Sequence, residues 1–333
     1  MKSSWQHSSM IKNLIYYVCP FAQADCRVEW ENNIAVLRQY IHKFDGRKIV
    51  TIATGPKMVD PKEVARYFDG TGCEIEEIPN RRKAGENIPF ANALLKLEGD
   101  DRNAMTFYAH AKGVSPKHHK MPHHDLRSMR TWRNLMYHCN LSDVEYVESV
   151  LQKQKSFGIL KRSDDELPTP WYYPGTFFWF RHDAVFGHGD WNHVEDHYCG
   201  VEMYLGRLLD NEDAHSDLNG ASPIATRDLY STEREGWTAA IAGHEVTIEE
   251  IENMNNLCIE NSGYTYYDPE PRTFRSQTTD AQAGVSTGYT CFSVVLAQPA
   301  LQNFAHAVAG QLRANMNQFR QFEGRQTRPQ QLD

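Results

Sequence analysis

The 333-residue chain lacks several features that would mark specialised protein classes. No apolar run approaches the roughly 18 residues of a membrane-spanning helix, and the run at 14–18 is too short for a signal-peptide core. The seven cysteines are scattered and include no C-x-x-C pair, which argues against a disulfide framework or a structural zinc site. Acidic residues outnumber basic residues by 43 to 35, so no nucleic-acid partner is expected. These absences predict a cytoplasmic protein with no transmembrane segment.

Short β-rich runs alternate with amphipathic helical stretches through the first 110 residues. This alternation predicts an α/β fold with a mainly parallel sheet and helical crossovers. Farther along, the pattern predicts more helices and two strands, one of them an aromatic run. The predicted strands cover residues 14–18, 48–53, 73–78, 105–109, 157–160 and 176–180. The predicted helices cover residues 29–44, 61–67, 86–97, 125–141, 144–155, 194–209 and 246–256.

The composition changes near the C-terminus. From about residue 266 onward Gln, Thr, Ser and Ala dominate the sequence. We therefore expect one domain over residues 1–265 and a C-terminal appendage over 266–333 that is partly helical or disordered, with an amphipathic helix at 301–322.

The end of the fourth predicted strand carries the first candidate site, in the segment Tyr-Ala-His110-Ala-Lys112-Gly. In an open parallel sheet, ligands bind beyond the carboxyl ends of the strands. The Lys112 ammonium suits phosphate oxygens, and His110 suits a metal or a hydrogen bond. The alternative is a strand-end histidine beside a solvated lysine.

Three arginines recur every third residue on the helix predicted at 125–141. Arg127, Arg130 and Arg133 share one face at this spacing. Guanidinium groups on one face could clamp an anionic group, although a cationic solvent-exposed face would show the same pattern.

An aromatic segment at 171–181 and a later carboxylate form a further candidate site. Aromatic faces such as that of Trp179 stack on sugar rings, and Gly175 permits close approach of a ligand to the backbone. Successive strand residues point to opposite faces, so part of this segment is expected to be core. Glu202 and Asp196 lie on the helix predicted at 194–209, where a carboxylate could return to the cleft as a general base.

A second group of histidines suggests a different chemistry. His193 and His197 are four residues apart, a spacing found in zinc hydrolases, and His188 lies nearby. However, Glu195 does not occupy the position of the base in an H-E-x-x-H motif. A His-ligated metal hydrolase is therefore a lesser alternative.

The order of these features resembles a glycosyltransferase-like family with an aromatic-H-x-K-G element, a W-R-x-x-M helix, a G-N-F-W-W-type strand and a later Glu. The resemblance spans residues 13–210, and the matching segments are 107–113, 132–136 and 175–179, followed by Glu202. It implies the GT-A fold of nucleotide-diphospho-sugar transferases, a Rossmann-type sheet flanked by helices. The sequence departs from the family pattern at Thr176, which replaces Asn. In addition, no Asp-x-Asp motif stands at the position of His110 and Lys112, where many GT-A enzymes hold a metal, so dependence on Mn²⁺ or Mg²⁺ stays open.

The resemblance implies transfer of a sugar from a nucleotide-diphospho-sugar to a hydroxyl of a glycan or glycolipid acceptor, with surface-polysaccharide or glycan assembly as one setting. Strand ends at 18–21 and 53–55 would hold the nucleotide. A non-catalytic carbohydrate- or nucleotide-binding module on the same fold is the main alternative. The implied roles are catalysis for Glu202 and His110, diphosphate binding for Lys112, Arg127, Arg130 and Arg133, and sugar or acceptor binding for Gly175, Thr176 and Trp179.

Overall fold

The computed structural model describes residues 9–81, 85–116, 125–163, 169–218 and 229–257. The appendage predicted at 266–333, with its helix at 301–322, lies outside the described residues. The described strands form one seven-stranded sheet, in the order β3-β2-β1-β4-β6-β5-β7. The strands are β1 Ile11–Val18, β2 Lys48–Thr54, β3 Glu74–Pro79, β4 Ala104–His110, β5 Ser156–Ile159, β6 Phe178–Arg181 and β7 Ala214–Asp217. The helices are α1 Ala24–Tyr40, α2 Pro61–Ala65, α3 Asn87–Leu97, α4 Leu126–Leu141, α5 Val144–Leu151, α6 His182–Phe186, α7 Tyr204–Leu208, α8 Arg234–Ala240 and α9 Ile248–Asn253.

The sheet is mainly parallel. Strands β3, β2, β1 and β4 pair in parallel, and β5 pairs in parallel with β7. Strand β6 runs antiparallel to both of its neighbours, β4 and β5. The predicted α/β class with a mainly parallel sheet flanked by helices is therefore confirmed. No helix in the described part of the chain is both long enough and apolar enough to cross a membrane.

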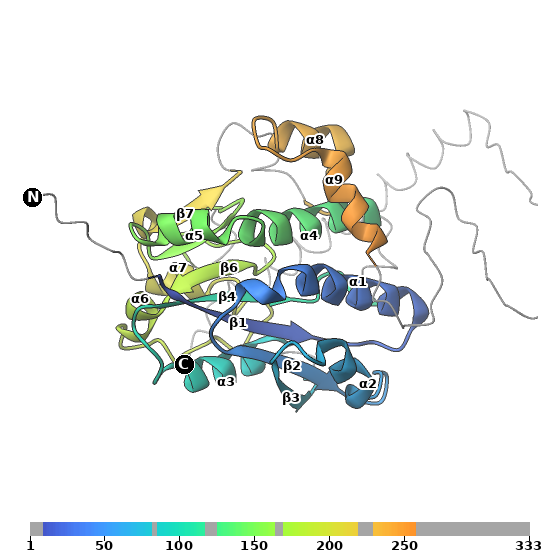
Figure 1. Ribbon diagram of the computed structural model, residues 1–333, viewed down its shortest axis with the longest axis horizontal. Helices are drawn as coiled ribbons and strands as arrows, with labels where there is room; N and C mark the ends of the chain where they lie inside the picture. The colour runs from blue at the N-terminus through green and yellow to red at the C-terminus, as the bar shows by residue number, and fades with distance from the viewer. Residues whose placement is uncertain (1–8, 82–84, 117–124, 164–168, 219–228, 258–333) are drawn as a thin grey trace, which may run out of the picture. The chain divides into compact units, whose positions relative to one another are not determined.

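Both faces of the sheet are covered, and strand β1 shows why. Its side chains point alternately to opposite faces. Leu14, Tyr16 and Val18 pack in the core that includes α1, α4 and α5. Ile15 packs in a second core with Phe90 of α3. Figure 1 shows α1 and α4 on one side of the sheet and α3 on the other, as these two cores require.

The helix starts follow local capping chemistry. The side chain of Asp60 accepts a hydrogen bond from the Lys62 backbone before the first turn of α2, which contains Pro61. Asp143 accepts from the Tyr146 backbone at the start of α5. Aspartate is one of the residue types that favour this position, so both helix starts follow from the sequence.

The helix predicted at 194–209 is largely wrong, because only α7 Tyr204–Leu208 is α-helical within it. The side-chain amide of Asn87 donates to the carbonyl oxygens of Glu195 and His197 at 2.8 and 2.7 Å. In a helix these two carbonyl groups would accept hydrogen bonds from N–H groups of the same helix. Here they accept them from the first residue of α3 instead. As a result, Glu202 lies in a turn just before α7.

The strand order reverses between β1 and β4. From β1 the chain proceeds outward through β2 to β3, and then returns to β4 on the other side of β1. Such a switch point leaves a crevice beyond the carboxyl ends of the two strands, which is where open α/β sheets bind ligands. The register pairs Tyr17 with His110 at this end.

Candidate functional site

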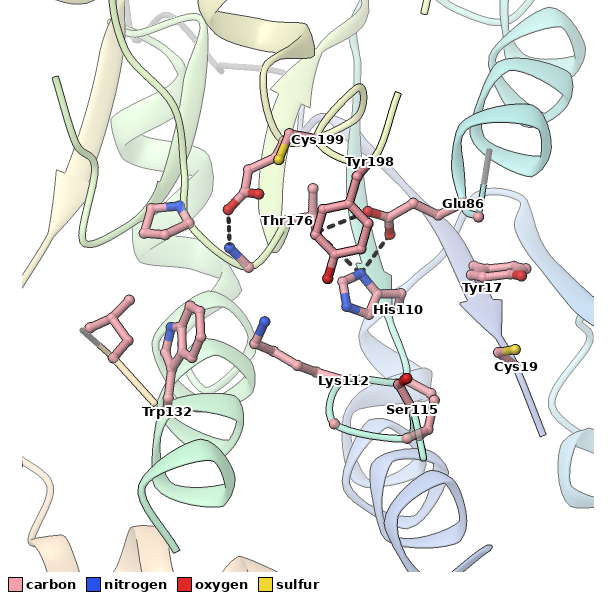
Figure 2. A pocket seen from close by; sticks show the side chains of 18 of the residues that line it. Tyr17, Cys19, Glu86, His110, Lys112, Ser115, Trp132, Thr176, Tyr198 and Cys199 are labelled. Atoms are coloured by element: carbon pink, nitrogen blue, oxygen red, sulfur yellow. Dashed lines mark hydrogen bonds and ion pairs between the residues drawn. The ribbon is translucent and has the colours of Figure 1, made fainter. Parts of the chain in front are cut away.

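A cavity of about 470 Å³ opens at the carboxyl ends of β1 and β4, a size typical of small-molecule sites. Tyr17, Cys19 and Phe21 line it from the end of β1, and His110 and Lys112 from the end of β4. Segments far away in sequence complete the wall. They contribute Glu86 before α3, Trp132 on α4, and the lining residues Gly175, Thr176, Tyr198, Cys199, Glu202 and Tyr230 (Figure 2).

The backbone of Lys112 is fixed from helix α1. The side chain of Asn33, itself fully buried, accepts from the Lys112 N–H at 3.1 Å and donates to the Lys112 carbonyl at 3.0 Å. Gly113 then adopts a φ of 83°, which favours glycine. A Cβ at Gly113 would also lie 2.4 Å from the Met129 side chain. The loop that carries Lys112 therefore has little freedom.

The ammonium group of Lys112 is buried and forms no ion pair with a described residue. Its Nζ lies 3.9 Å from the ring centroid of Trp132 and 5.5 Å from that of Tyr230. The residue is 7% exposed. Burial lowers the pKa of Lys112 below its ordinary value. The ammonium group thus lies against aromatic faces at the cavity wall, and no acidic side chain among the described residues contacts it. A cation in this position is suited to bind an anion.

A second group centres on the carboxylate of Glu86. Nδ1 of His110 lies 2.6 Å from Oε2 of Glu86, and the Tyr108 hydroxyl donates to the same oxygen at 2.7 Å. The Thr176 hydroxyl donates to Oε1 at 3.3 Å. Burial acts to raise the pKa of Glu86, but the His110 ring and the hydrogen bond from Tyr108 lower it below its ordinary value. Glu86 is therefore a fixed negative charge beside His110.

The pKa of Glu202 shifts in the opposite direction to that of Glu86. Burial raises the pKa of Glu202, and the opposing effects of Lys112 and the Gly175 N–H are smaller. That N–H donates to Oε1 of Glu202 at 2.8 Å. Burial and the neighbouring Glu202 carboxylate raise the pKa of the Cys199 thiol to about 11. Glu202 is thus suited to exchange a proton, whereas Cys199 stays a thiol.

The turn beside these carboxylates is strained. Thr176 has a φ of 62°, a left-handed conformation that is unfavourable for a β-branched residue. Gly175, with a φ of 90°, would place a Cβ 2.9 Å from both Met136 and Trp132. Strained backbone of this kind clusters at functional sites, and here it brings Gly175 to Glu202 and Thr176 to Glu86.

The structure brings together only some of the residues singled out from the sequence. His110, Lys112, Gly175, Thr176 and Glu202 all line the cavity. The strand end at 18–21 contributes Cys19 and Phe21. The second strand end, 53–55, is not among the described lining residues.

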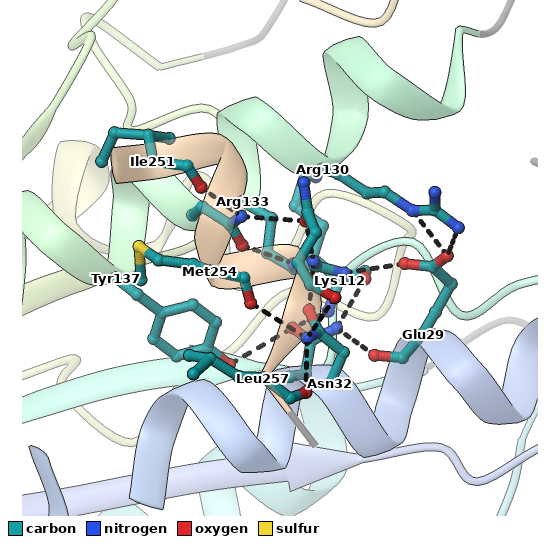
Figure 3. Close-up of polar contacts among 12 residues, drawn as sticks. Glu29, Asn32, Lys112, Arg130, Arg133, Tyr137, Ile251, Met254 and Leu257 are labelled. Atoms are coloured by element: carbon teal, nitrogen blue, oxygen red, sulfur yellow. Dashed lines mark hydrogen bonds and ion pairs between the residues drawn. The ribbon is translucent and has the colours of Figure 1, made fainter. Parts of the chain in front are cut away.

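The three arginines do not line the cavity. Arg127 is exposed in the first turn of α4. Arg130 and Arg133 are buried and form ion pairs with Glu29 of α1. Arg133 also donates to Asn32 and Asn255 at 2.5 and 2.8 Å (Figure 3). The anion expected for Arg130 and Arg133 is therefore a carboxylate of the protein itself.

Trp179 is also part of the core. It is fully buried, its ring stacks on Phe44, and its indole N–H donates to the Asn140 carbonyl at 2.9 Å. The adjacent Phe178 and Phe180 pack in the core on the opposite face. Trp179 therefore does not line the cavity, and the sugar- or acceptor-binding role that the resemblance implies for it is not supported by its position.

The histidines considered as metal ligands do not converge. Within the described ranges, no group of three or more His, Cys, Asp or Glu side chains is arranged to hold a metal ion. His197 instead pairs with Glu195 at 2.7 Å. The described residues thus contain no ligand cluster of the kind that the metal-hydrolase alternative requires.

Glu86 is the main site residue that sequence reasoning missed. Its only signal was its position at the start of the helix predicted at 86–97, close to an expected strand end. Tyr198 and Tyr230 gave no signal, because they lie on irregular segments. Trp132 enters the sequence analysis only as the first residue of the W-R-x-x-M segment, yet its ring faces Lys112 whereas Arg133 points to Glu29.

The fold and the site together define an α/β protein with a charged cavity at a topological switch point. No family model matches the sequence, and no curated protein matches it. Solved structures with a similar arrangement include 4-diphosphocytidyl-2C-methyl-D-erythritol synthase from Anaerococcus prevotii, at 8% identity and a TM-score of 0.33, covering 69% of this chain and 96% of that one. Another is a protein provisionally named a nucleotide-diphospho-sugar transferase, from Desulfovibrio desulfuricans. It has 12% identity and a TM-score of 0.33, and the match covers 70% of this chain and 98% of that one. Similarity at this level carries no conclusion about activity.

Proposed function

We propose that this protein is a glycosyltransferase that moves a sugar from a nucleotide-diphospho-sugar to an acceptor hydroxyl. The observation that carries the proposal is the ammonium of Lys112, buried at the wall of a cavity at the switch point without an ion-pair partner among the described residues. A diphosphate supplies the missing negative charge, and its position beyond β1 and β4 is the one that nucleotides take in open α/β sheets.

The donor would lie across the two strand ends. Lys112 is placed for the diphosphate, and its fixed backbone limits the entropy lost when the ammonium pairs with phosphate oxygens. Tyr17, Cys19 and Phe21, at the end of β1, would contact the nucleoside. Gly175 and Thr176 would face the sugar or the acceptor. Because all these groups line one cavity, a single extended ligand can contact them together.

Glu202 is our candidate for the general base. In the transfer, the acceptor oxygen forms a bond to the anomeric carbon while the bond from that carbon to the diphosphate oxygen breaks. The electron pair of the broken bond stays on the diphosphate, beside Lys112, and the acceptor proton passes to Glu202. A raised pKa suits a base working near neutral pH.

The two carboxylates of the cavity support this division of roles. The pKa of Glu86 is lowered and that of Glu202 is raised, and such divergence separates a permanent charge from a proton carrier. In the proposed reaction Glu86 stays ionised throughout, and Glu202 is the carboxylate that changes its protonation state.

The test is incubation of the full-length chain with a panel of nucleotide-diphospho-sugars and simple glycan or glycolipid acceptors, following the release of nucleoside diphosphate. We expect release that depends on the acceptor with at least one donor. Binding without turnover across the panel would favour a non-catalytic binding module. The absence of both binding and turnover would refute the proposal.

Glu202→Gln provides the sharper test. The amide keeps the shape and the hydrogen bond from Gly175 but accepts no proton, so we expect turnover to fall by about 10²–10⁴-fold with little change in donor binding. Glu212→Gln, at an exposed position in the same part of the chain, is the matched control. Unchanged turnover in Glu202→Gln would remove Glu202 from the reaction.

A further inference from the structure

We infer that Glu86 is a positioning residue that fixes the ring of His110, so that Nε2 is the ring nitrogen presented to the diphosphate. The inference deepens the proposed function and rests on it. It assigns to the site a residue that the sequence did not indicate, and it gives His110 a defined orientation.

Glu86 and His110 differ in hydrogen-bonding capacity, and this difference fixes where the proton lies. An ionised carboxylate can only accept hydrogen bonds. Since Oε2 of Glu86 lies 2.6 Å from Nδ1 of His110, that nitrogen must carry the proton of the bond. A ring rotated by a half-turn would place a carbon at the carboxylate and lose the bond. The hydrogen bond therefore fixes both the proton on Nδ1 and the orientation of the ring.

Glu86 is itself held in place by two further hydrogen bonds. The Tyr108 hydroxyl donates to Oε2 at 2.7 Å and the Thr176 hydroxyl to Oε1 at 3.3 Å. Tyr108 is fully buried on β4, two residues before His110. His110 also packs against Phe177, with ring centroids 5.7 Å apart. The carboxylate and the ring are thus anchored by the same strand and by the strained turn at Thr176.

The other ring nitrogen of His110 remains available for a ligand. Nε2 of His110 forms no hydrogen bond with a described residue, and His110 lines the same cavity as Lys112 (Figure 2). When the ring is protonated, Nε2–H donates to the diphosphate oxygen that receives the electron pair, and Lys112 supplies a second positive charge. Hydrogen-bond donors and cations that are already in place where negative charge develops stabilise the transition state and so increase the reaction rate.

The experiment is a double-mutant cycle on the binding of inorganic pyrophosphate, a probe that needs no nucleoside or sugar. Calorimetry compares wild-type protein with Glu86→Gln, His110→Gln and the double variant. We expect each single variant to lose about tenfold in affinity, the value of one charge-assisted hydrogen bond. If Glu86 acts through His110, the double variant loses no more than either single variant. Glu98→Gln, at an exposed position after the same helix, should bind as wild type does.

A spectroscopic measurement tests the positioning role without any ligand. Long-range proton–nitrogen correlation spectra of protein labelled at its 15 histidines identify the His110 signals as those missing from His110→Gln. We expect the neutral ring to carry its proton on Nδ1 in wild type and to become a mixture of tautomers in Glu86→Gln. Glu86→Asp, which keeps the charge, should restore part of the Nδ1 form and part of the affinity.

The outcomes separate the inference from the function on which it rests. Three results would each overturn the inference: additive losses of affinity in the cycle, tighter binding of pyrophosphate by Glu86→Gln, or an unchanged tautomer in Glu86→Gln. In each of these cases, binding of pyrophosphate by the wild-type protein would leave the proposed function standing. Failure of wild-type protein to bind pyrophosphate and nucleoside diphosphates would overturn both. Coupled losses together with a tautomer change would support the assignment of Glu86.

Discussion

Two groups of buried charged side chains involve the same two helices, α1 and α4, but only one of the groups has its ion-pair partners within the described protein. Around Glu29, the arginines Arg130 and Arg133 of α4 reach a carboxylate on α1 (Figure 3). Around Lys112, Asn33 of α1 holds the backbone and Trp132 of α4 faces the ammonium. The first group pairs its charges within the protein. The second leaves one cation without an ion-pair partner in the described part of the chain.

The two groups also differ in the volume of the cavity beside them. The Glu29 group borders a void of only about 10 Å³, whereas the Lys112 group borders about 470 Å³. A fully paired buried network connects helices and fixes their arrangement. A buried charge next to open volume instead costs stability that a ligand can recover. Pairing and volume together, and not the presence of charge, distinguish a structural cluster from a binding site.

The largest expected contrast comes from removing one cation from each group. Arg133→Met leaves Glu29 with a single partner, and it removes the Arg133 hydrogen bonds to the buried amide oxygens of Asn32 and Asn134. The free energy of unfolding should therefore fall by about 3 kcal/mol. Lys112→Met breaks no ion pair with a described residue and removes a buried ammonium, so stability should change by less than about 1 kcal/mol. Its affinity for pyrophosphate should nevertheless fall by at least about tenfold.

Urea unfolding and calorimetry measure the two quantities for each variant. Lys153→Met, at an exposed position, is the control for loss of a lysine charge. If the two variants changed stability and affinity in parallel, the distinction between a structural and a ligand-binding cluster would not hold.

The two groups should also respond to pH with opposite signs. Burial acts to raise the pKa of Glu29, but Arg130 and Arg133 lower it below the ordinary 4.5. Its contribution to stability is therefore present above pH 4.5 and lost as the pH falls through the lowered pKa. Burial raises the pKa of Glu202, so its contribution is present below 4.5 and lost as the pH rises through the raised pKa. At pH 7, Glu29→Gln should be less stable than wild type and Glu202→Gln more stable.

Urea unfolding of both variants from pH 7 downward checks these signs. The advantage of Glu202→Gln should shrink first, as wild-type Glu202 takes up its proton near and above pH 4.5. The deficit of Glu29→Gln should persist until the pH falls below 4.5. A destabilised Glu202→Gln at pH 7 would mean that Lys112 and the Gly175 N–H outweigh the cost of burial, and Glu202 would no longer be a plausible base.

The repeating elements of the fold could be predicted because periodicity is local. The strands β1 to β5 and the helices α1, α3 and α4 follow the spacing of apolar residues, and the caps at Asp60 and Asp143 follow from residue type. The segment at 194–209 was predicted poorly, since Asn87, more than 100 positions away, determines which carbonyl groups are paired there. Periodicity within one segment carries no information about such a distant partner.

The absence of information about distant partners also explains which residues of the candidate site could be predicted. His110 and Lys112 could be placed because a strand end has a known direction. Whether Arg133 or its neighbour Trp132 faces the cavity depends on where Glu29 lies on α1, and spacing along one helix does not contain that information. Glu86 escaped notice because its role depends on Tyr108 and His110 of another element.

The smallest expected effect concerns the turn between the two carboxylates. Thr176 has a φ of 62°, where asparagine is far more common than a β-branched residue, and the resembling family has asparagine at this position. Thr176→Asn should therefore raise the free energy of unfolding by about 1 kcal/mol, since a left-handed non-glycine residue stores about 1–3 kcal/mol. The change also removes the hydrogen bond from the threonine hydroxyl to Glu86, but at 3.3 Å that bond is long.

Thr238→Asn, an exposed change within α8, is the control and should give no gain, because asparagine has no advantage over threonine in a helix. Urea unfolding of both variants measures the difference. A loss of stability in Thr176→Asn would show that the contacts of the threonine hydroxyl, 3.3 Å from Oε1 of Glu86 and 3.2 Å from Nδ1 of His110, stabilise the fold more than the backbone strain destabilises it.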